Sequence, residues 1–156
     1  MNSKIKKKYI FLDHKTDAFI ESYGDDINEA FENATLAMMD LMIDLDTIDT
    51  IYEESISVVG EDYEKLLYNW LESILLKSCI DQILFKSFHV KISENTNGFI
   101  LNSTVCGEKL NYNKHKLKIE IKSPTYHEMK IILKPHAIIR YLLELKNIIF
   151  SYKFSE

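Results

Sequence analysis

Glycine is scarce in this sequence: only four occur among 156 residues, and they lie far apart at positions 24, 60, 98 and 107. Phosphate-binding loops and dinucleotide fingerprints need several glycines within a few residues, so both motifs are excluded. The sequence also lacks the local signatures of serine and cysteine nucleophiles, which leaves a catalytic triad without support. Nucleotide hydrolysis and acyl transfer by the common motifs are therefore not expected.

Cysteines and long apolar runs are also few. Cys79 and Cys106 do not form a Cys-x-x-Cys pair, and they fit free buried thiols in a reduced cytosolic protein better than a zinc pair or a disulfide framework. No segment approaches the roughly 20 consecutive apolar residues of a membrane span. The basic residues 1–8 lack the apolar stretch of a signal peptide. We therefore expect a soluble, cytoplasmic protein with no membrane partner.

Positive charge is in the minority, since the formal net charge is -5 and the pI is about 5.6. This balance argues against a broad phosphate-binding surface, so no direct nucleic-acid binding is expected. Any RNA partner would be reached through another protein. With 46% hydrophobic residues, the chain is long enough for one domain with a real core and too short for two comfortable ones.

Two segments carry apolar residues at the spacing of one helical face. The first begins at a predicted capping box, in which Asp26 caps the helix and Glu29 reaches back, and it continues to Met42. The second is expected over residues 61–77, with Trp70 in the middle of its apolar stripe as a core anchor. We see no internal repeat and no linker.

Shorter segments with alternating apolar residues predict strands around these helices. Two helices and several antiparallel strands indicate an α+β fold, a two-layer sandwich in which two amphipathic helices pack on one mixed, mainly antiparallel sheet. Phe31, Met38, Trp70 and Ile74 are expected in the shared core. The predicted strands are residues 8–11, 19–24, 50–59, 84–92, 99–106, 117–122, 126–133 and 138–145.

Potential ligands are concentrated in residues 13–17 (Asp-His-Lys-Thr-Asp), which join the first two predicted strands. A hairpin or tight corner there would bring Asp13, His14 and Asp17 to the end of a sheet. Aspartate and threonine are also ordinary turn residues that need no other role. Together with Glu128 and Glu144 from the last strands, these carboxylates suit a hard cation such as Ca²⁺ or Mg²⁺ better than zinc.

Several motifs taken together resemble the archease family. Residues 11–17 resemble the Leu-Asp/Glu-His-Thr-Ala-Asp opening of the archeases, with Lys15 and Thr16 in place of the usual Thr-Ala. The match covers residues 8–145 in the right order, so we assign 1–145 to one archease-like domain and 146–156 to a C-terminal extension of unknown role. The other matching motifs are Glu29 to Ala34 with Leu41-Met42, Gly60-Glu61-Asp62 with Trp70-Leu71, Gly107-Glu108, Lys114-His115, Glu120-Ile121-Lys122 and Thr125 to Met129.

The resemblance implies a protein cofactor without catalytic residues of its own. Archeases promote guanylylation of an RtcB-type RNA ligase and so allow multiple turnover in tRNA splicing. GTP and tRNA would be reached only through that ligase. The alternative is a small metal-dependent hydrolase that uses Asp13, His14 and Asp17.

The resemblance also implies a divalent metal ion, with calcium as the first choice and magnesium or manganese as alternatives. In the family the ion lies between the second aspartate of the opening motif, matched by Asp17, and an Asp-Ile pair that ends the last strand. Here the chain has Glu-Leu instead, so Glu144 would supply the carboxylate and Leu145 a backbone carbonyl. Asp13 and His14 are candidates for an additional contact to the metal or the partner.

Overall fold

The computed structural model describes residues 7–146, within which two α-helices, one short 3-10 helix and seven strands are formed. Helices with antiparallel strands confirm the predicted α+β class. In chain order the elements are β1 (Tyr9–Leu12), β2 (Ala18–Gly24), α1 (Ile27–Met42), η1 (Leu45–Thr47), β3 (Tyr52–Gly60), α2 (Tyr63–Cys79), β4 (Ile83–Asn95), β5 (Gly98–Lys109), β6 (Ile121–Ile132) and β7 (Ala137–Leu145).

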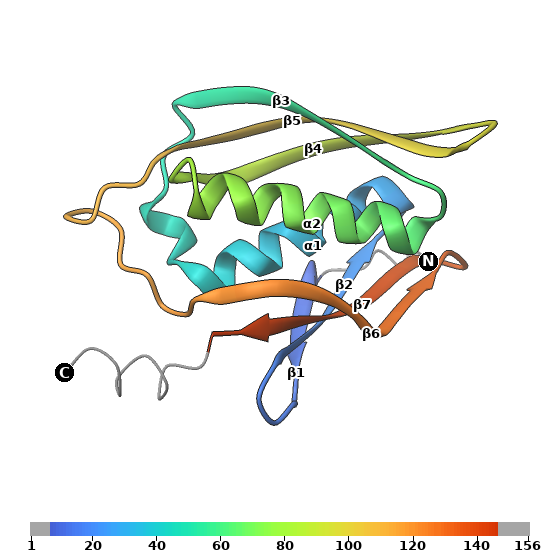
Figure 1. Ribbon diagram of the computed structural model, residues 1–156, viewed down its shortest axis with the longest axis horizontal. Coiled ribbons are helices and arrows are strands. Elements are labelled where there is room, and N and C mark those ends of the chain that lie inside the picture. Colours follow the sequence, from blue (N-terminus) through green and yellow to red (C-terminus); the bar gives the residue numbers. More distant parts are fainter. Residues whose placement is uncertain (1–6, 147–156) are drawn as a thin grey trace.

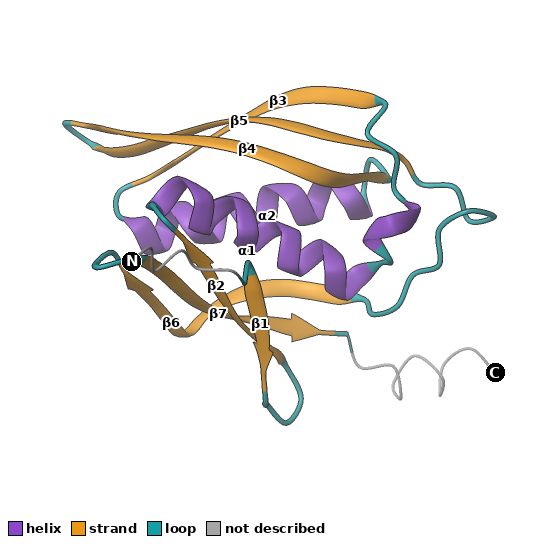
Figure 2. Ribbon diagram, turned by 180° about the vertical axis from the view of Figure 1, so that it is seen from behind, coloured by secondary structure: helices purple, strands orange, loops and turns teal. Residues whose placement is uncertain are grey.

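The strands form two sheets, and the two helices lie between them (Figure 1). One sheet has the strand order β1-β2-β7-β6 and the other β3-β5-β4, with antiparallel pairing throughout. The single sheet of the sequence prediction is therefore corrected to two, and the two-layer arrangement to three layers. Figure 2 shows the same order of layers from behind.

The helices are buried on more than one side because each contacts both sheets: α1 packs against β2 and β4, and α2 against β3 and β6. The predicted stripe accounts for one side of α1. Asn33, Thr35 and Met39 are buried outside that stripe. A helix that packs on one sheet needs only one apolar face, whereas a helix between two sheets needs more. The buried residues beyond the stripe were therefore a sign of the second sheet.

The predicted core is confirmed. Phe31, Met38, Trp70 and Ile74 each have 0% solvent exposure. The indole Nε1 of Trp70 donates a hydrogen bond to the carbonyl oxygen of Phe31 at 3.2 Å, which joins the two helices. Neither helix within residues 7–146 is long and apolar enough to cross a membrane.

Two local predictions are wrong. The strand predicted over residues 117–122 starts only at Ile121, the first residue of β6. Residues 117–120 are not a strand, and Leu117 forms only an isolated bridge with Ile43. Their alternating pattern comes from an extended connection whose Leu117 side chain is 45% exposed. The two cysteines are free, as expected, but Cys79 is exposed and Cys106 only half-buried, so neither is a buried thiol.

The junction between a strand and the following helix occurs twice with the same contacts, a repeat that the sequence pattern did not reveal. Both α-helices begin after an aspartate cap, so the cap predicted at Asp26 is confirmed. The second half of the predicted capping box differs, because Glu29 accepts the backbone N–H of Asp25 and not that of Asp26. A Cβ atom on either junction glycine would lie within 2.5 Å of a helix backbone nitrogen. In each junction a side-chain amide on the helix donates to the backbone carbonyl of the residue before the glycine, at 2.7 Å in both cases. The corresponding pairs are the glycines Gly24 and Gly60, the caps Asp26 and Asp62, and the amides Asn33 and Asn69.

Candidate functional site

The predicted loop between the first two strands is present. The last pair of the β1–β2 ladder is Leu12 with Phe19, and residues 13–17 form the connection. This hairpin extends away from the helices (Figure 1). The polar side chains of residues 13–17 therefore lie at one end of the four-stranded sheet.

The register of β2 against β7 brings the predicted ligands to the same place. Ala18 pairs with Leu143 as the last pair of this ladder. Asp17 directly precedes Ala18 and Glu144 directly follows Leu143, so both residues lie just beyond that pair. The hydroxyl of Ser123 in β6 donates to Oε2 of Glu144 at 3.3 Å, and Leu145 pairs with Ile121. Residues that are far apart in sequence are thus neighbours at one sheet end.

His14 connects this loop to a bulge in β6. Its Nδ1 lies 4.0 Å from Oδ2 of Asp17, and its Nε2 lies 3.7 Å from Oε2 of Glu128. Glu128 has a φ of 58°, which is uncommon for a residue other than glycine, within a shift of register between Thr125 and Lys130. Such bulges redirect side chains and occur often beside functional sites. Here the bulge allows the Glu128 carboxylate to approach His14.

The donor atoms at this end fit a hard cation better than a transition metal, since they are mainly carboxylate oxygens. Within residues 7–146, however, no three His, Cys, Asp or Glu side chains are close enough together to hold a metal ion. The predicted set needs only two such side chains, Asp17 and Glu144, with a backbone carbonyl as the third donor. Asp13 is exposed and forms no hydrogen bond or ion pair with the described residues, so no contact favours the hydrolase alternative.

Glu108, Lys114 and His115, which belong to two of the family-like motifs, meet in a separate network. The ammonium of Lys114 lies 2.8 Å from Oε2 of Glu108 and 2.6 Å from Oδ2 of Asp49. The hydrogen bonds from Lys114 lower the pKa of the Glu108 and Asp49 carboxyl groups. The same bonds raise the pKa of Lys114. Glu108 also accepts the backbone N–H of Asp49. The motif residues thus fasten the segment before β3 to the end of β5.

His115 completes this network from the inside, with 1% exposure. Its Nδ1 accepts the backbone N–H of Asn111 at 3.0 Å, so the ring proton of the neutral tautomer is on Nε2. That nitrogen lies 3.5 Å from Oε1 of Glu108 and has no hydrogen-bond partner among the described residues. The histidine holds the loop after β5 in place and is too deep to meet a ligand.

At about pH 7 the Glu108→Gln variant is expected to unfold more easily than the wild type by about 1–3 kcal/mol, because a neutral amide accepts the Lys114 ammonium less strongly. The pKa of wild-type Glu108 is lowered, so its contribution is complete above the ordinary value of 4.5 and is lost as the pH falls through the folded-state pKa. Urea unfolding at about pH 7 and about pH 3 should show the difference closing in acid. Glu53→Gln, on an exposed position of β3, is the control, and a difference independent of pH would refute this explanation.

Arg140 in β7 has a structural contact on the outer face of the four-stranded sheet. Its Nε donates to Glu21, the residue paired with it across β2 and β7, and the hydroxyl of Tyr23 donates to the same carboxylate. Burial would raise the pKa of Glu21, but the hydrogen bonds from Tyr23 and Arg140 outweigh it, and the pKa is lowered. Burial and the bond to Glu21 raise the pKa of Tyr23 to about 12. The arginine therefore strengthens the ladder that positions Asp17.

The model of the Archease protein family (MTH1598/TM1083) matches residues 9–143. A protein named Protein archease from Pyrococcus abyssi is 38% identical over 125 residues, covering 80% of this chain and 88% of the relative. One from Sulfolobus acidocaldarius is 37% identical over 139 residues, covering 88% of this chain and 99% of the relative. The match to the family model ends one residue before Glu144.

A solved structure has the same fold. The solution structure of Methanobacterium thermoautotrophicum protein 1598 superposes with a TM-score of 0.77 at 33% sequence identity, covering 88% of this chain and 99% of that chain. The two proteins therefore share one fold over most of this chain.

Proposed function

This chain belongs to the archease family, and we propose that it is a non-catalytic protein cofactor that activates an RtcB-type RNA ligase in tRNA splicing. The activation consists of promoting guanylylation of the ligase, which allows multiple turnover. The family match over residues 9–143 is the observation that carries this function, because it includes the opening motif at residues 13–17. GTP and tRNA are bound by the ligase, and both proteins act in the cytoplasm.

A divalent ion at the end of the β2–β7 ladder is part of the same proposal. Two carboxylates held next to each other repel unless a cation or a proton lies between them. Asp17 and Glu144 lie just beyond the last ladder pair, which supports this pair as ligands, with the carbonyl of Leu145 as a neutral third donor. Calcium suits these oxygen donors best, and magnesium or manganese are the alternatives. The ion would supply a fixed positive charge that joins the loop to the strand end.

His14 has a supporting role in this arrangement. It lies between the Asp17 and Glu128 carboxylates at 4.0 and 3.7 Å, so it can hold the loop against the bulge of β6 while leaving Asp17 oxygens free for the ion. Asp13 is exposed on the same loop, and this arrangement of the ion and its ligands does not use it.

We expect that adding this protein to a purified RtcB-type ligase with GTP and a divalent metal increases the fraction of guanylylated ligase at each time point. With broken tRNA in excess, the ligase should then complete many turnovers, whereas without this protein it stalls after about one. The protein alone should join no RNA and hydrolyse no GTP. Ligation by the protein alone, or an unchanged ligase, would refute the proposed function.

A further inference from the structure

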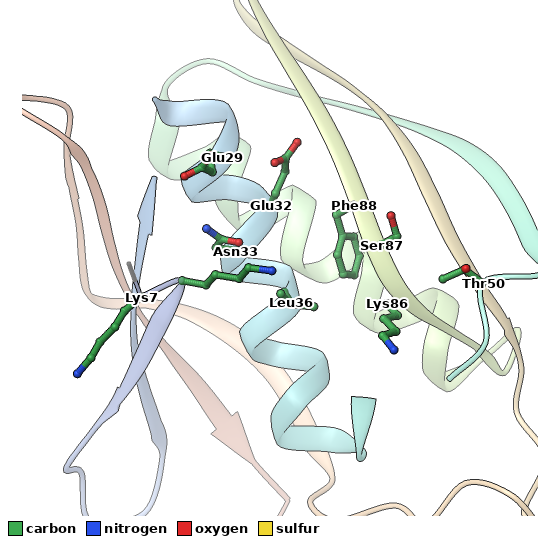
Figure 3. Close-up of a pocket in the computed structure, with 10 residues that line it drawn as sticks. Lys7, Glu29, Glu32, Asn33, Leu36, Thr50, Lys86, Ser87 and Phe88 are labelled. Carbon is green, nitrogen blue, oxygen red and sulfur yellow. The ribbon is translucent and has the colours of Figure 1, made fainter. Parts of the chain in front are cut away.

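A pocket of about 540 Å³ opens between α1 and β4, on the side where β1 and β4 are the outer strands of their sheets (Figure 3). Its volume is within the range of pockets that hold small-molecule ligands. None of the candidate-site residues lines it, so a ligand in this pocket would be independent of the proposed function. The lining residues that bear on such a ligand are Lys7, Lys8, Glu32, Leu36, Lys86 and Phe88.

One part of the pocket wall is basic. Lys7 and Lys8 come from the segment before β1, and Lys86 comes from β4. None of these three amines is within ion-pair distance of a carboxylate in the described part of the chain, although other lysines of this acidic protein form such pairs. Lys86 is near enough to Asp49 for its charge to help lower the pKa of that carboxyl group. Ammonium groups around a concave surface attract an anion. A phosphate group fits this wall.

The wall on α1 is acidic, since Glu29 and Glu32 both line the pocket there (Figure 3). Oε2 of Glu32 accepts the backbone N–H of Val90 at 2.8 Å, which fixes the carboxylate against the edge of β4. Its Oε1 has no hydrogen-bond partner among residues 7–146. Nδ1 of His89 lies 3.8 Å from Oε2, and burial, as the largest effect, raises the pKa of Glu32. A ligand that presents N–H groups here would supply donors to this carboxylate.

Phe88 and Leu36 form the apolar part of the pocket lining. The ring of Phe88 lies between β4 and α1, and Leu36 lines the same pocket (Figure 3). The Phe88 ring is held edge-on by Trp70, with ring centroids 6.2 Å apart. A planar heterocycle gains contact area on such a surface, whereas an inorganic anion gains none. The ligand therefore needs three parts: an anionic group, a flat ring and N–H donors on that ring.

We propose that this pocket binds a nucleoside 5′-monophosphate, with its phosphate at the lysines, its base on Phe88 and the N–H edge of the base at Glu32. Guanine is the best match, because it presents two adjacent N–H donors to a carboxylate. The repulsion between Glu32 and a phosphate fixes this orientation. The pocket has no glycine-rich loop, so it is unlike the nucleotide motifs that the sequence excludes.

Binding is tested by calorimetric titration of the full chain with GMP, guanosine and inorganic phosphate. GMP should bind at least about tenfold more tightly than either fragment, because only GMP reaches both walls. Lys86→Gln should weaken GMP binding about tenfold, since a charge-assisted bond to phosphate is lost. Lys91→Gln, an exposed lysine on the same strand, should leave it unchanged. Glu32→Gln should weaken GMP but not phosphate, with its fold verified by circular dichroism because Glu32 also holds Val90.

Three results would overturn the assignment. Phosphate binding as tightly as GMP would reduce the pocket to an anion site. Unchanged GMP binding by Lys86→Gln would place the nucleotide elsewhere, and this variant remains decisive if Glu32→Gln does not fold. Failure of GMP to bind the wild type at millimolar concentration would mean that the pocket holds no nucleotide.

Discussion

Replacing Trp70 with alanine is expected to lower the free energy of unfolding by about 3–5 kcal/mol. The side chain is fully buried between the two sheets, so its removal leaves a large cavity that the surrounding strands cannot close. The substitution also removes the hydrogen bond to the carbonyl of Phe31 and the edge contact with Phe88. These losses affect α1, α2 and β4 together, which is why a single residue has so large an effect.

Urea unfolding followed by far-UV circular dichroism measures this loss without relying on the fluorescence of the only tryptophan. Trp70→Phe keeps one aromatic ring and loses the indole hydrogen bond and part of the buried volume, so it should cost less than Trp70→Ala. Ile80→Ala, at a position 71% exposed, should change stability by less than about 0.5 kcal/mol. A loss below about 1 kcal/mol for Trp70→Ala would mean that the residue is not a core anchor.

The helices could be predicted from sequence because their signals are local. The cap at Asp26, the apolar spacing of α1 and the stripe around Trp70 all depend on residues within a few turns of one another. The division of the strands into two sheets was not predicted. An alternating pattern shows that a strand has one buried face, but it does not show which strands share hydrogen bonds. The same ambiguity made residues 117–120, which precede β6, look like part of a strand.

The candidate site could be predicted in part for a similar reason. The opening motif identified residues 13–17, and the hairpin around them is a local feature. The approach of His14 to Glu128 depends on the bulge in β6, and no sequence pattern predicted that bulge. The network of Asp49, Glu108 and Lys114 was also missed, because it joins segments that only the fold brings together. Motif matching found two of its residues without indicating their structural role.

The Asp17→Asn variant is expected to fold normally and to lose the stabilisation that a divalent ion gives the wild type. Asparagine keeps the shape of the side chain but removes one of the two charges at the end of the β2–β7 ladder. An ion that binds only the folded state raises the free energy of unfolding by about 2.7 kcal/mol at a hundred times its Kd. Thermal unfolding with increasing Ca²⁺ should therefore raise the Tm of the wild type and leave that of Asp17→Asn almost constant.

Two further variants separate the ligands from the rest of the loop. Asp13→Asn makes the same chemical change at an exposed residue of the same loop, and it should keep the calcium response. Glu144→Gln should reduce the response, because it removes the second carboxylate. Equal calcium responses of wild type and Asp17→Asn would show that Asp17 is only a turn residue, and the same measurement with Mg²⁺ and Mn²⁺ identifies the preferred ion.

Multiple turnover of an RtcB-type ligase in the presence of the Asp17→Asn variant tests the central claim most directly. The assay contains GTP, the divalent ion, broken tRNA in excess and an equal amount of wild type, Asp17→Asn or Asp13→Asn. We expect sustained ligation with the wild type and with Asp13→Asn, and about one turnover with Asp17→Asn. Sustained ligation with Asp17→Asn would contradict the proposal that Asp17 and its bound ion activate the ligase.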